Sequence, residues 1–591
     1  MSAAKQQAGM TRLKPVDFVI IGGGWTGLAM AKELTARTPL SVLVLERGDM
    51  PGPTEYAYGM DEIDYSVRLK MMQNTAEETI THRHSSRESA NPVRQYGSFL
   101  PGTGVGGAGE HWAGLAWRYN PDVFTMRTTL AERHGANRLP ADLAVQDWGI
   151  TYNDLESHYW SAERVMGVGG KAGNLRGTIV PGGNPYEGPR QHEYPLPPLK
   201  TSYFASLVRD GAAKIGLHPH PSPSALLSEA YRNPDGVARP ACEYCGFCER
   251  FGCMIGAKSQ PTNTLLPVVR RRKTFTMRTG AWVRRIVHKS GRVTGVEYTD
   301  AAGKRFFQPA TTVVLSTFTL NNVRLLALSS IGTPYDPATN RGTLGKNLTH
   351  QVHWRTPVFF DKPLNSFIGN GALATRVSDY DTKLPPGGGG LLRFGAFNGL
   401  TRGDRPATYF GTMPSGAAKS NWGAEWKKAS IDWYDRGAAV GFVGDHLSWR
   451  QNYMDLDPTY TDKFGDPLLR FTLDWTEHEF RQREVADGIA REIGRAMGAR
   501  LDETKPTRAR YSVVNYLSTH IQGGAVMGTS PETSVVNRYL QHWDLPDLFV
   551  IGASAFPQNP SHNPTLTAVA VTTWAADAII GRYLKAPGKL L

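Results

Sequence analysis

Four cysteines lie within twelve residues, and the 591-residue chain contains no others. They are separated by two, two and four residues: Cys242, Cys245, Cys248 and Cys253. Disulfides that stabilise a fold usually close long loops, so clustered thiols indicate metal ligands instead. An iron–sulfur cluster needs several thiolates close together, which a loop with these gaps can supply. Structural zinc is the alternative, although its sites usually pair two knuckles from separate segments, and free structural cysteines are a third interpretation.

A glycine motif near the N-terminus indicates a dinucleotide site. Gly22, Gly24 and Gly27 form a Gly-x-Gly-x-x-Gly sequence between an apolar run and a segment with helical spacing. These glycines permit a tight turn, a close approach of backbone to a pyrophosphate, and packing of helix on strand. A second apolar run ends at Glu46, which is placed to accept hydrogen bonds from a ribose. The alternative is a glycine-rich turn without a ligand.

A second glycine-rich stretch, 102–114, contains Gly106 and Gly107 and includes the pair His111-Trp112. Backbone this rich in glycine is typical of close contact with a flat or crowded partner. Near the C-terminus, an apolar run is followed by Gly552 and a loop rich in proline and asparagine. This strand, glycine and loop resemble the last strand of a flavoprotein sheet, which caps the isoalloxazine end of its cofactor.

The periodic patterns predict the elements that position these residues. Buried strands are expected at 17–21, 41–45, 311–316 and 548–551, and an antiparallel meander at 275–287, 293–298 and 304–307. Helices are expected at 152–165, 320–328, 477–497 and 564–584. Residues 51–100 are polar and irregular, whereas the region from about 350 to 470 predicts a second domain. Because the first and last segments both look like parts of one nucleotide domain, we expect a discontinuous fold.

The bulk composition narrows the class of protein. A chain of 591 residues predicts two or more domains, and no apolar run is long enough to predict a transmembrane helix. The stretch before the first strand has no apolar run, so we expect no secretory signal in this chain. The net charge is +13, but the basic residues are scattered and only 270–273 is dense, which argues against nucleic acid as a partner.

Several motifs together resemble the glucose–methanol–choline (GMC) flavoprotein oxidoreductases. They are the N-terminal glycine motif, the 102–114 loop, the segments 315–332 and 344–348, and the C-terminal segment. The cysteine segment and the pair His562-Asn563 resemble the flavoprotein subunits of membrane-bound sugar and sugar-acid dehydrogenases, gluconate 2-dehydrogenase above all. The resemblance covers nearly the whole chain and is least secure over 350–470.

The resemblance implies an α/β fold, α+β overall: a discontinuous Rossmann-like FAD-binding domain, an inserted antiparallel-sheet substrate domain, and a cysteine-rich iron–sulfur loop. The expected boundaries are FAD-binding parts at 1–135, 263–349 and 506–591, a connecting cap region at 136–234, the cysteine loop at 235–262, and the substrate domain at 350–505.

The resemblance also implies roles for residues. The family oxidises an alcohol by hydride transfer to the flavin while a base takes the hydroxyl proton, and His520 matches its first active-site histidine. A histidine suits this role because its pKa lies near neutrality. Asn563 matches the second active-site position, where an amide can orient the substrate oxygen, and His562 is the rival base. The alternatives are a core histidine at position 520 and a helix N-cap at position 563.

His111 resembles the position where some relatives attach the flavin covalently, and the alternative is a histidine that merely packs beside the ring. For the cysteines the resemblance favours a [3Fe-4S] cluster, which would use three of the four thiols, over a [4Fe-4S] cluster. It further implies electron transfer to a multihaem cytochrome c subunit and quinone, at the periplasmic face of the bacterial inner membrane. A small subunit with a twin-arginine signal would export the folded chain.

The expected function is therefore oxidation of a sugar acid, D-gluconate at C2 foremost, followed by 2-ketogluconate, sorbitol, fructose and glucose as substrates. Two other hypotheses remain open at this point. One is a soluble oxidase of the same superfamily with zinc at the cysteines. The other is a non-catalytic flavin-binding or assembly subunit.

Overall fold

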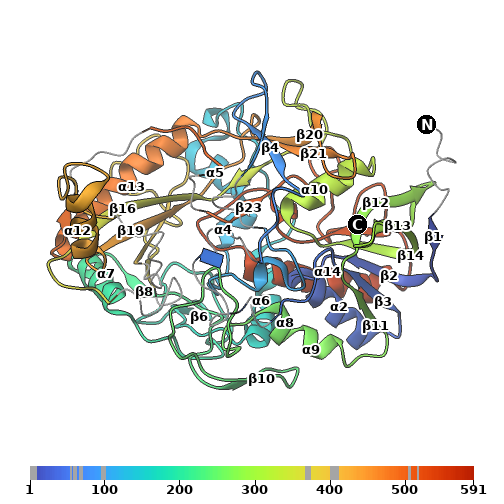
Figure 1. Ribbon diagram of the computed structural model, residues 1–591, viewed down its shortest axis with the longest axis horizontal. Coiled ribbons are helices and arrows are strands. Elements are labelled where there is room, and N and C mark those ends of the chain that lie inside the picture. Colours follow the sequence, from blue (N-terminus) through green and yellow to red (C-terminus); the bar gives the residue numbers. More distant parts are fainter. Residues whose placement is uncertain are drawn as a thin grey trace.

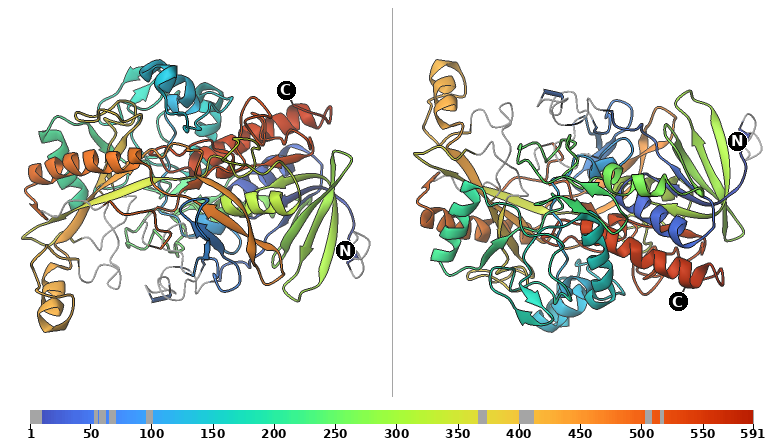
Figure 2. Two further views of the ribbon diagram at one scale, coloured as in Figure 1. Left: turned by 90° about the horizontal axis from the view of Figure 1, so that it is seen from above. Right: turned by 90° about the horizontal axis from the view of Figure 1, so that it is seen from below.

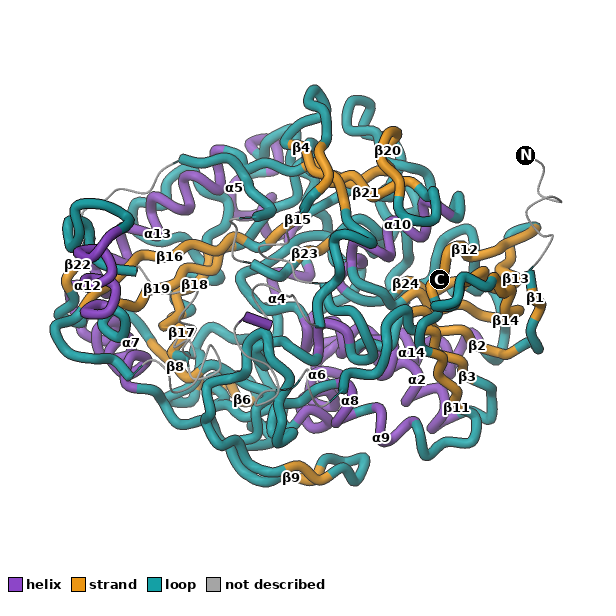
Figure 3. The backbone as a smooth tube through the Cα atoms, viewed as in Figure 1, coloured by secondary structure: helices purple, strands orange, loops and turns teal. Residues whose placement is uncertain are grey.

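The computed structural model places two large sheets at opposite ends of an elongated molecule (Figure 1). Long loop segments run between the two ends (Figure 3). The described residues are 10–52, 56, 63–64, 71–94, 101–365, 374–399, 412–502, 508–514 and 518–590. Within these ranges, every helix is too short or too polar to cross a membrane.

The first sheet is built on parallel strands that come from both ends of the chain. Its parallel strands lie in the order β24 (Leu548–Val550), β14 (Arg305–Leu315), β2 (Val16–Ile21), β3 (Val42–Leu45) and β11 (Phe275–Arg278). β2 and β3 are joined by α2 (Trp25–Arg37), as the glycine motif predicts. Because β24 pairs with β14, the C-terminal segment completes the N-terminal domain, and the predicted discontinuous Rossmann-like fold is confirmed.

An antiparallel meander extends this sheet through the first half of β14. It consists of β12 (Trp282–Lys289) and β13 (Arg292–Thr299), and β1 (Thr11–Arg12) adds to β14 in parallel. Two details of the prediction are wrong. The strand expected at 275–287 is split, because Gly280 has a φ of +63° that turns the chain and sends β11 beside β3.

The second error concerns the strands expected separately at 304–307 and 311–316, which form the single strand β14. The ladder crosses Pro309 because its partner Gly295 has no Cβ. A Cβ on Gly295 would lie 2.2 Å from the carbonyl oxygen of Gln308.

Three helices close one face of the parallel sheet region. α14 (Thr565–Ala578) packs against both α2 and α6 (Tyr152–Met166). Two views show the red C-terminal helix beside the blue N-terminal helix (Figure 2). The Thr151 hydroxyl accepts from the N–H of Asp154, whose carboxylate accepts from the N–H of Thr151, so α6 begins at a capping box. The helix expected at 564–584 is present as α14, and a π-helical turn at Ile579–Tyr583 follows it.

The second large sheet is antiparallel, as expected for the inserted domain. Its strands lie in the order β22 (Arg500–Leu501), β16 (Val352–Phe359), β19 (Gly437–Gly444), β18 (Gly395–Gly399), β17 (Thr375–Val377) and β8 (Pro219–Pro221). Helices α7 (Tyr203–Lys214) and α13 (Glu477–Ala496) pack on it and on each other, and α12 (Gly423–Trp433) lies at the same end of the molecule (Figure 1).

A third sheet has four strands and pairs two segments that lie far apart in the sequence. It contains β20 (Tyr453–Thr461), β21 (Pro467–Thr472), β4 (Ile80–Arg83) and β5 (Asn91–Pro92). The 51–100 region is thus less irregular than expected, because β4 gains its partner β21 only in the folded chain. The domain boundaries stay a prediction, and the one at 505/506 lies outside the described residues.

The remaining elements are short or lie between these sheets. They are α4 (Pro121–Phe124), α5 (Met126–His134), α8 (Pro261–Thr264), α9 (Leu266–Val269), α10 (Thr319–Leu328), β6 (Asn174–Leu175), β7 (Thr178–Ile179), β9 (Tyr231–Arg232), β10 (Ala238–Arg239), β15 (Thr349–His350) and β23 (Ile521–Gln522).

Candidate active site

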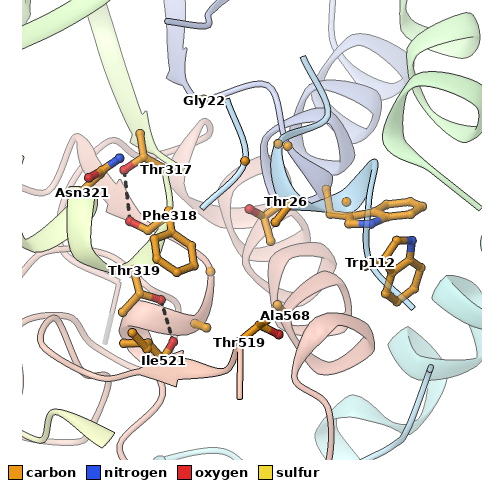
Figure 4. Close-up of a pocket in the computed structure, with 18 of the residues that line it drawn as sticks. Gly22, Thr26, Trp112, Thr317, Phe318, Thr319, Asn321, Thr519, Ile521 and Ala568 are labelled. Carbon is orange, nitrogen blue, oxygen red and sulfur yellow. Dashed lines mark hydrogen bonds between the residues drawn. The ribbon is translucent and has the colours of Figure 1, made fainter. Parts of the chain in front are cut away.

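A cavity of about 420 Å³ lies between the two large sheets. The carboxyl ends of four parallel strands open into it, and the residues at those ends are Gly22, Glu46, Ser316 and Gly552. This is the edge at which open α/β sheets bind their ligands. Figure 4 shows Gly22, Thr26 and Trp112 on one side of the cavity and the Thr317–Thr319 segment on another.

The glycine motif forms the turn that its spacing predicts. Gly22 has a φ of +104°, and a Cβ there would lie 2.5 Å from the Ser316 carbonyl oxygen. A Cβ on Gly27 would lie 2.1 Å from the Gly22 carbonyl oxygen, whereas one on Gly24 would meet nothing closer than 3.7 Å. Two glycines are therefore required by the turn and by helix packing, and the third leaves backbone open to the cavity. The N-terminus of α2 has no side-chain cap, so its N–H groups remain for a phosphate.

Glu46 is buried at the end of β3 and braces this turn. Its carboxylate accepts from the N–H of Gly23 at 2.8 Å and from the N–H of Gly48 at 3.0 Å. Burial raises the pKa of Glu46, and these two hydrogen bonds oppose the rise. The second glycine loop docks here, since the N–H of Gly106 donates to the Gly23 carbonyl at 2.8 Å. Gly106 and Gly107 both line the cavity, so the two glycine stretches form one wall.

His111 and Trp112 continue that wall. His111 is buried, and its Nε2 has no hydrogen-bond partner among the described residues. Burial lowers the pKa of His111 to about 3, so the ring is neutral. Trp112 packs edge-on against Trp25, with ring centroids 5.7 Å apart. A buried ring nitrogen without a partner at the cavity wall fits a contact with a bound flavin.

His520 and Asn563 meet on the opposite side of the cavity. The Nδ2 of Asn563 lies 3.1 Å from Nε2 of His520, and both residues line the cavity. His520 immediately precedes β23, whose pairing with β15 brings it beside Gln351. The ring nitrogen Nδ1 of His520 lies 2.7 Å from Oε1 of Gln351. The two residues that the sequence singles out are therefore in direct contact, and Gln351 is a third that it missed.

Gln351 determines which nitrogen of His520 carries the proton. Its Nε2 donates to the carbonyls of Pro560 and His562, at 2.9 and 3.0 Å, which orients the amide oxygen toward His520. The network therefore assigns the proton of His520 to Nδ1 and leaves the lone pair of Nε2 toward Asn563 and the cavity. Burial lowers the pKa of His520 to about 4, so the ring is neutral near pH 7 and can accept a proton.

His562 lies behind the cavity and is not among its lining residues. Its Nε2 is 3.5 Å from Asp381, and its ring packs edge-on against Trp117 at 5.9 Å. Burial lowers the pKa of His562 to about 3, despite the charge of Asp381. Asp381 also accepts from the guanidinium of Arg376. The geometry therefore favours His520 over His562 as the base.

The antiparallel sheet forms the cavity wall next to His520. Gln351, His353 and Arg355 alternate along β16 and its entrance, so one face of the strand presents all three. Four other arginines line the cavity and pair with acids: Arg47 with Glu78, Arg250 with Glu249 at 3.9 Å, Arg284 with Asp466 at 2.6 Å, and Arg324 with Asp462 at 2.7 Å.

Arg355 differs from those arginines. Its Nε is buried without a hydrogen-bond partner, and no carboxylate in the described part of the chain pairs with its guanidinium. The sequence offered no signal for this residue, because the chain contains many arginines and only the strand register places this one at the cavity.

All four cysteines line one small cavity, together with Lys258. They are free thiols, and two of the sulfurs accept backbone N–H groups: Cys242 from Tyr244 at 3.4 Å, and Cys253 from Lys258 at 3.5 Å. Burial raises the pKa of Cys242 to about 11 and raises that of Cys248 as well. Both are therefore protonated unless a metal ion binds.

The side chains of the described residues, as they stand, form no group of three that could hold a metal ion. A thiol group turns about a single bond, however, and the fold already brings four of them to one cavity. Four thiolates suit an iron–sulfur cluster and also suit a structural zinc ion.

Two regions, 232–353 and 449–572, match the GMC oxidoreductase family, and residues 20–75 match NAD(P)-binding Rossmann-like domains. The chain is 39% identical to the gluconate 2-dehydrogenase flavoprotein of Pantoea cypripedii, over 98% of this chain and 96% of that protein. The chain belongs to the GMC oxidoreductase family. It is also 26% identical to the fructose dehydrogenase large subunit of Gluconobacter japonicus, over 95% of this chain and 97% of that subunit.

Solved structures agree on the fold. The GMC oxidoreductase fold of this chain superposes on pyridoxine 4-oxidase from Mesorbium loti with a TM-score of 0.60, covering 95% of this chain and 98% of that one. Formate oxidase from Aspergillus oryzae gives a TM-score of 0.59. The identities are 17% and 13%, so these likenesses concern the fold alone.

Membership of the GMC oxidoreductases confirms the expected enzyme class, an FAD-dependent oxidoreductase acting on CH–OH groups. The cavity fits that cofactor. It combines a glycine cradle at a helix N-terminus, a buried acid at the end of β3, and a ring nitrogen of His111 that lacks a partner among the described residues.

Proposed function

We propose that this GMC oxidoreductase is the catalytic flavoprotein subunit of a membrane-associated dehydrogenase that oxidises a sugar acid, with D-gluconate at C2 as the first candidate. The observation that carries the substrate class is the 39% identity, over nearly the full length, to a gluconate 2-dehydrogenase flavoprotein. The contact between His520 and Asn563 at the cavity supports an intact catalytic site rather than a non-catalytic subunit.

The chain's own residues would hold the cofactor along one wall. Gly22, Gly24 and Gly27 would cradle the pyrophosphate, and Glu46 would bind a ribose hydroxyl. Gly106, Gly107 and Gly552 line the same cavity and would also contact the cofactor. His111 would contact the flavin ring or bond to it covalently, beside Trp112, and its buried Nε2 without a partner among the described residues supports either role.

The proton chemistry belongs to His520. A bound flavin would supply the hydride acceptor for the carbon that carries the hydroxyl group. His520 accepts the hydroxyl proton at Nε2, because Gln351 keeps the ring's own proton on Nδ1. Asn563 donates from Nδ2 toward Nε2 of His520 in the free site, and in the complex it would orient the substrate oxygen. His520 is thus the base that this geometry supports best.

Arg355 would bind the carboxylate of the substrate. A carboxylate bound in a partly buried cavity needs a cation or several donors to offset lost hydration. Arg355 lines the cavity on the same strand face that begins with Gln351. The other arginines that line it already pair with acids: Arg47, Arg250, Arg284 and Arg324. Its guanidinium could form a bidentate pair with a carboxylate.

The cysteine loop would hold an iron–sulfur cluster: a [3Fe-4S] cluster on three of the four cysteines is favoured over a [4Fe-4S] cluster. Such a cluster supplies one-electron transfer, which suits onward transfer to a haem partner rather than to oxygen. We further propose a multihaem cytochrome c subunit with quinone as the final acceptor, a small subunit that carries the export signal, and a place at the periplasmic face of the inner membrane. Glu249 and Arg250 belong to the cysteine loop and also line the flavin cavity. This placement supports a short distance between the flavin and the cluster.

Metal analysis and spectroscopy of the chain purified without oxygen test this proposal. We expect a flavin absorption band, iron and acid-labile sulfide, and an iron–sulfur EPR signal. Zinc in place of iron, with rapid peroxide formation from substrate and oxygen, would instead identify a soluble oxidase.

A substrate panel with a dye acceptor tests the substrate class. We expect D-gluconate to give the highest kcat/KM among gluconate, 2-ketogluconate, sorbitol, fructose and glucose. A neutral sugar ranking first would overturn the sugar-acid assignment, and no reduction of the flavin by any of the five would revive the non-catalytic subunit.

A further inference from the structure

Lys258 is a fully buried lysine whose ammonium has three hydrogen bonds, all to neutral carbonyl oxygens. Its Nζ donates to Trp112 at 2.8 Å, to Cys248 at 2.7 Å and to Phe251 at 2.7 Å. These bonds use all three donors of the ammonium group. Carbonyl dipoles solvate a cation, but they do not neutralise it, so a charge in this position is costly without an anion.

No carboxylate from the described residues forms an ion pair with Lys258. The nearby carboxylate of Glu110 is turned to Gln260 and Thr262, whose side chains donate to it at 2.8 and 2.7 Å. Lys258 instead lines the same small cavity as the four cysteines. The backbone N–H of Lys258 also donates to the sulfur of Cys253 at 3.5 Å. The missing counter-charge therefore lies on the sulfur side.

The same lysine also joins the cysteine loop to the wall of the flavin cavity. Trp112 lines that cavity, whereas Cys248 and Phe251 belong to the loop. Two further hydrogen bonds reinforce the junction: the N–H of Arg250 donates to the His111 carbonyl at 2.6 Å, and Nε1 of Trp112 donates to the Ser259 carbonyl at 2.7 Å. The position of the loop relative to the cavity wall is thus set by direct contacts.

We propose that Lys258 is the built-in counter-charge of an anionic thiolate-bound centre at the four cysteines, and that it raises the reduction potential of that centre. The inference rests on the proposed function in taking an iron–sulfur cluster as the occupant. A cluster bound by thiolates is negatively charged and becomes more so when it gains an electron. A fixed cation in a buried site favours the reduced form and therefore makes electron uptake easier.

The test compares Lys258→Gln, which removes the charge, with Lys258→Arg, which retains it. The matched control is Lys200→Gln, because Lys200 is an exposed lysine that packs over Tyr244 of the same loop. The holoenzyme is purified without oxygen, its iron, zinc, sulfide and flavin contents are measured, and the cluster is titrated by EPR at defined potentials. Lys258→Gln is expected to lower the equilibrium constant for one-electron uptake at least tenfold, a downward shift of about 59 mV or more. Lys258→Arg should shift less, and Lys200→Gln should match the wild type.

The outcomes separate this inference from the proposed function. Lys258→Gln with full iron content and an unchanged potential would overturn the inference. If Lys258→Gln loses its metal, the charge-retaining variant decides: metal kept in Lys258→Arg supports the counter-charge, and equal loss in both variants refutes it. If the wild-type protein contains zinc instead of iron, the iron–sulfur proposal is wrong. The zinc contents of Lys258→Gln and Lys258→Arg then test whether Lys258 is the counter-charge of the thiolate site.

Discussion

His520 lines the large cavity and the four cysteines line a smaller one, and the surroundings of the two differ in charge and in origin. His520 is held by two neutral amides, Gln351 and Asn563, from distant parts of the chain. The cysteines come from one short segment and share their small cavity with the buried ammonium of Lys258. A base must remain neutral until it accepts a proton, so neutral partners suit it. A centre that accumulates negative charge gains from a fixed cation nearby.

Among these variants, His520→Ala is expected to have the largest effect, and it should act on the surroundings of His520 and not on the cysteines. Loss of the base should slow reduction of the flavin by substrate by roughly 10²–10⁴-fold, the usual contribution of general base catalysis. The metal content at the cysteines should stay at the wild-type level, because His520 forms no hydrogen bond to the cysteine loop among the described residues. Stopped-flow flavin bleaching and iron analysis measure the two quantities. His192→Ala, which changes an exposed histidine, is the control. A rate within a few-fold of wild type would remove His520 from the role of base.

Variants of Gln351 test whether this amide positions the ring of His520 and its proton. Gln351→Met should slow flavin reduction by about 10- to 100-fold, as for a residue that acts through its neighbour. Gln351→Glu should keep much of the rate but raise the pH midpoint of flavin reduction by about one unit or more, because a carboxylate at Nδ1 favours the protonated ring.

The matched control for these variants is Gln308→Met, a buried glutamine of β14 that does not line the cavity. It should leave the pH profile of flavin reduction unchanged. An unaltered pH profile in Gln351→Glu would show that Gln351 does not govern the proton of His520.

Arg355→Gln removes a positive charge from the large cavity, where the substrate is proposed to bind. We expect the KM for an aldonate to rise roughly 10- to 100-fold, because hydrogen bonds to charged groups contribute about 1.5–3 kcal/mol. The KM for a neutral hexose or polyol should change far less. Steady-state kinetics with paired charged and neutral substrates measure the difference. Equal effects on both substrates would assign Arg355 a structural role.

The smallest effect concerns acid stability. Burial lowers the pKa values of His111, His350 and His562 to about 3, and those of His220 and His520 to about 4. In the unfolded chain each would titrate near 6.5. Between these values the unfolded chain binds more protons, so stability should fall as pH drops from about 6.5 toward 4. Thermal unfolding followed at several pH values should show a falling Tm, and a flat Tm over this window would contradict it.

Local features of the site were predictable from the sequence. Gly22, Gly24 and Gly27 need only the turn between adjacent elements, and the geometry of that turn agrees with the expectation. The sequence also placed the four cysteines together, because a segment of twelve residues cannot separate its members far in space. Strand edges were less predictable: β11 and β4 take partners that no local pattern specifies.

The sequence by itself determined the turn chemistry, the helices with clear caps and the clustered thiols, since these depend on interactions over a few residues. The candidate base came from the resemblance to the family. Only the tertiary structure decided which polar groups face one another. Gln351 reaches His520 across 169 residues, and Lys258 reaches Trp112 across 146. Such contacts depend on sheet pairing and loop packing between distant segments, and a single glutamine or lysine carries no spacing signal that reveals them.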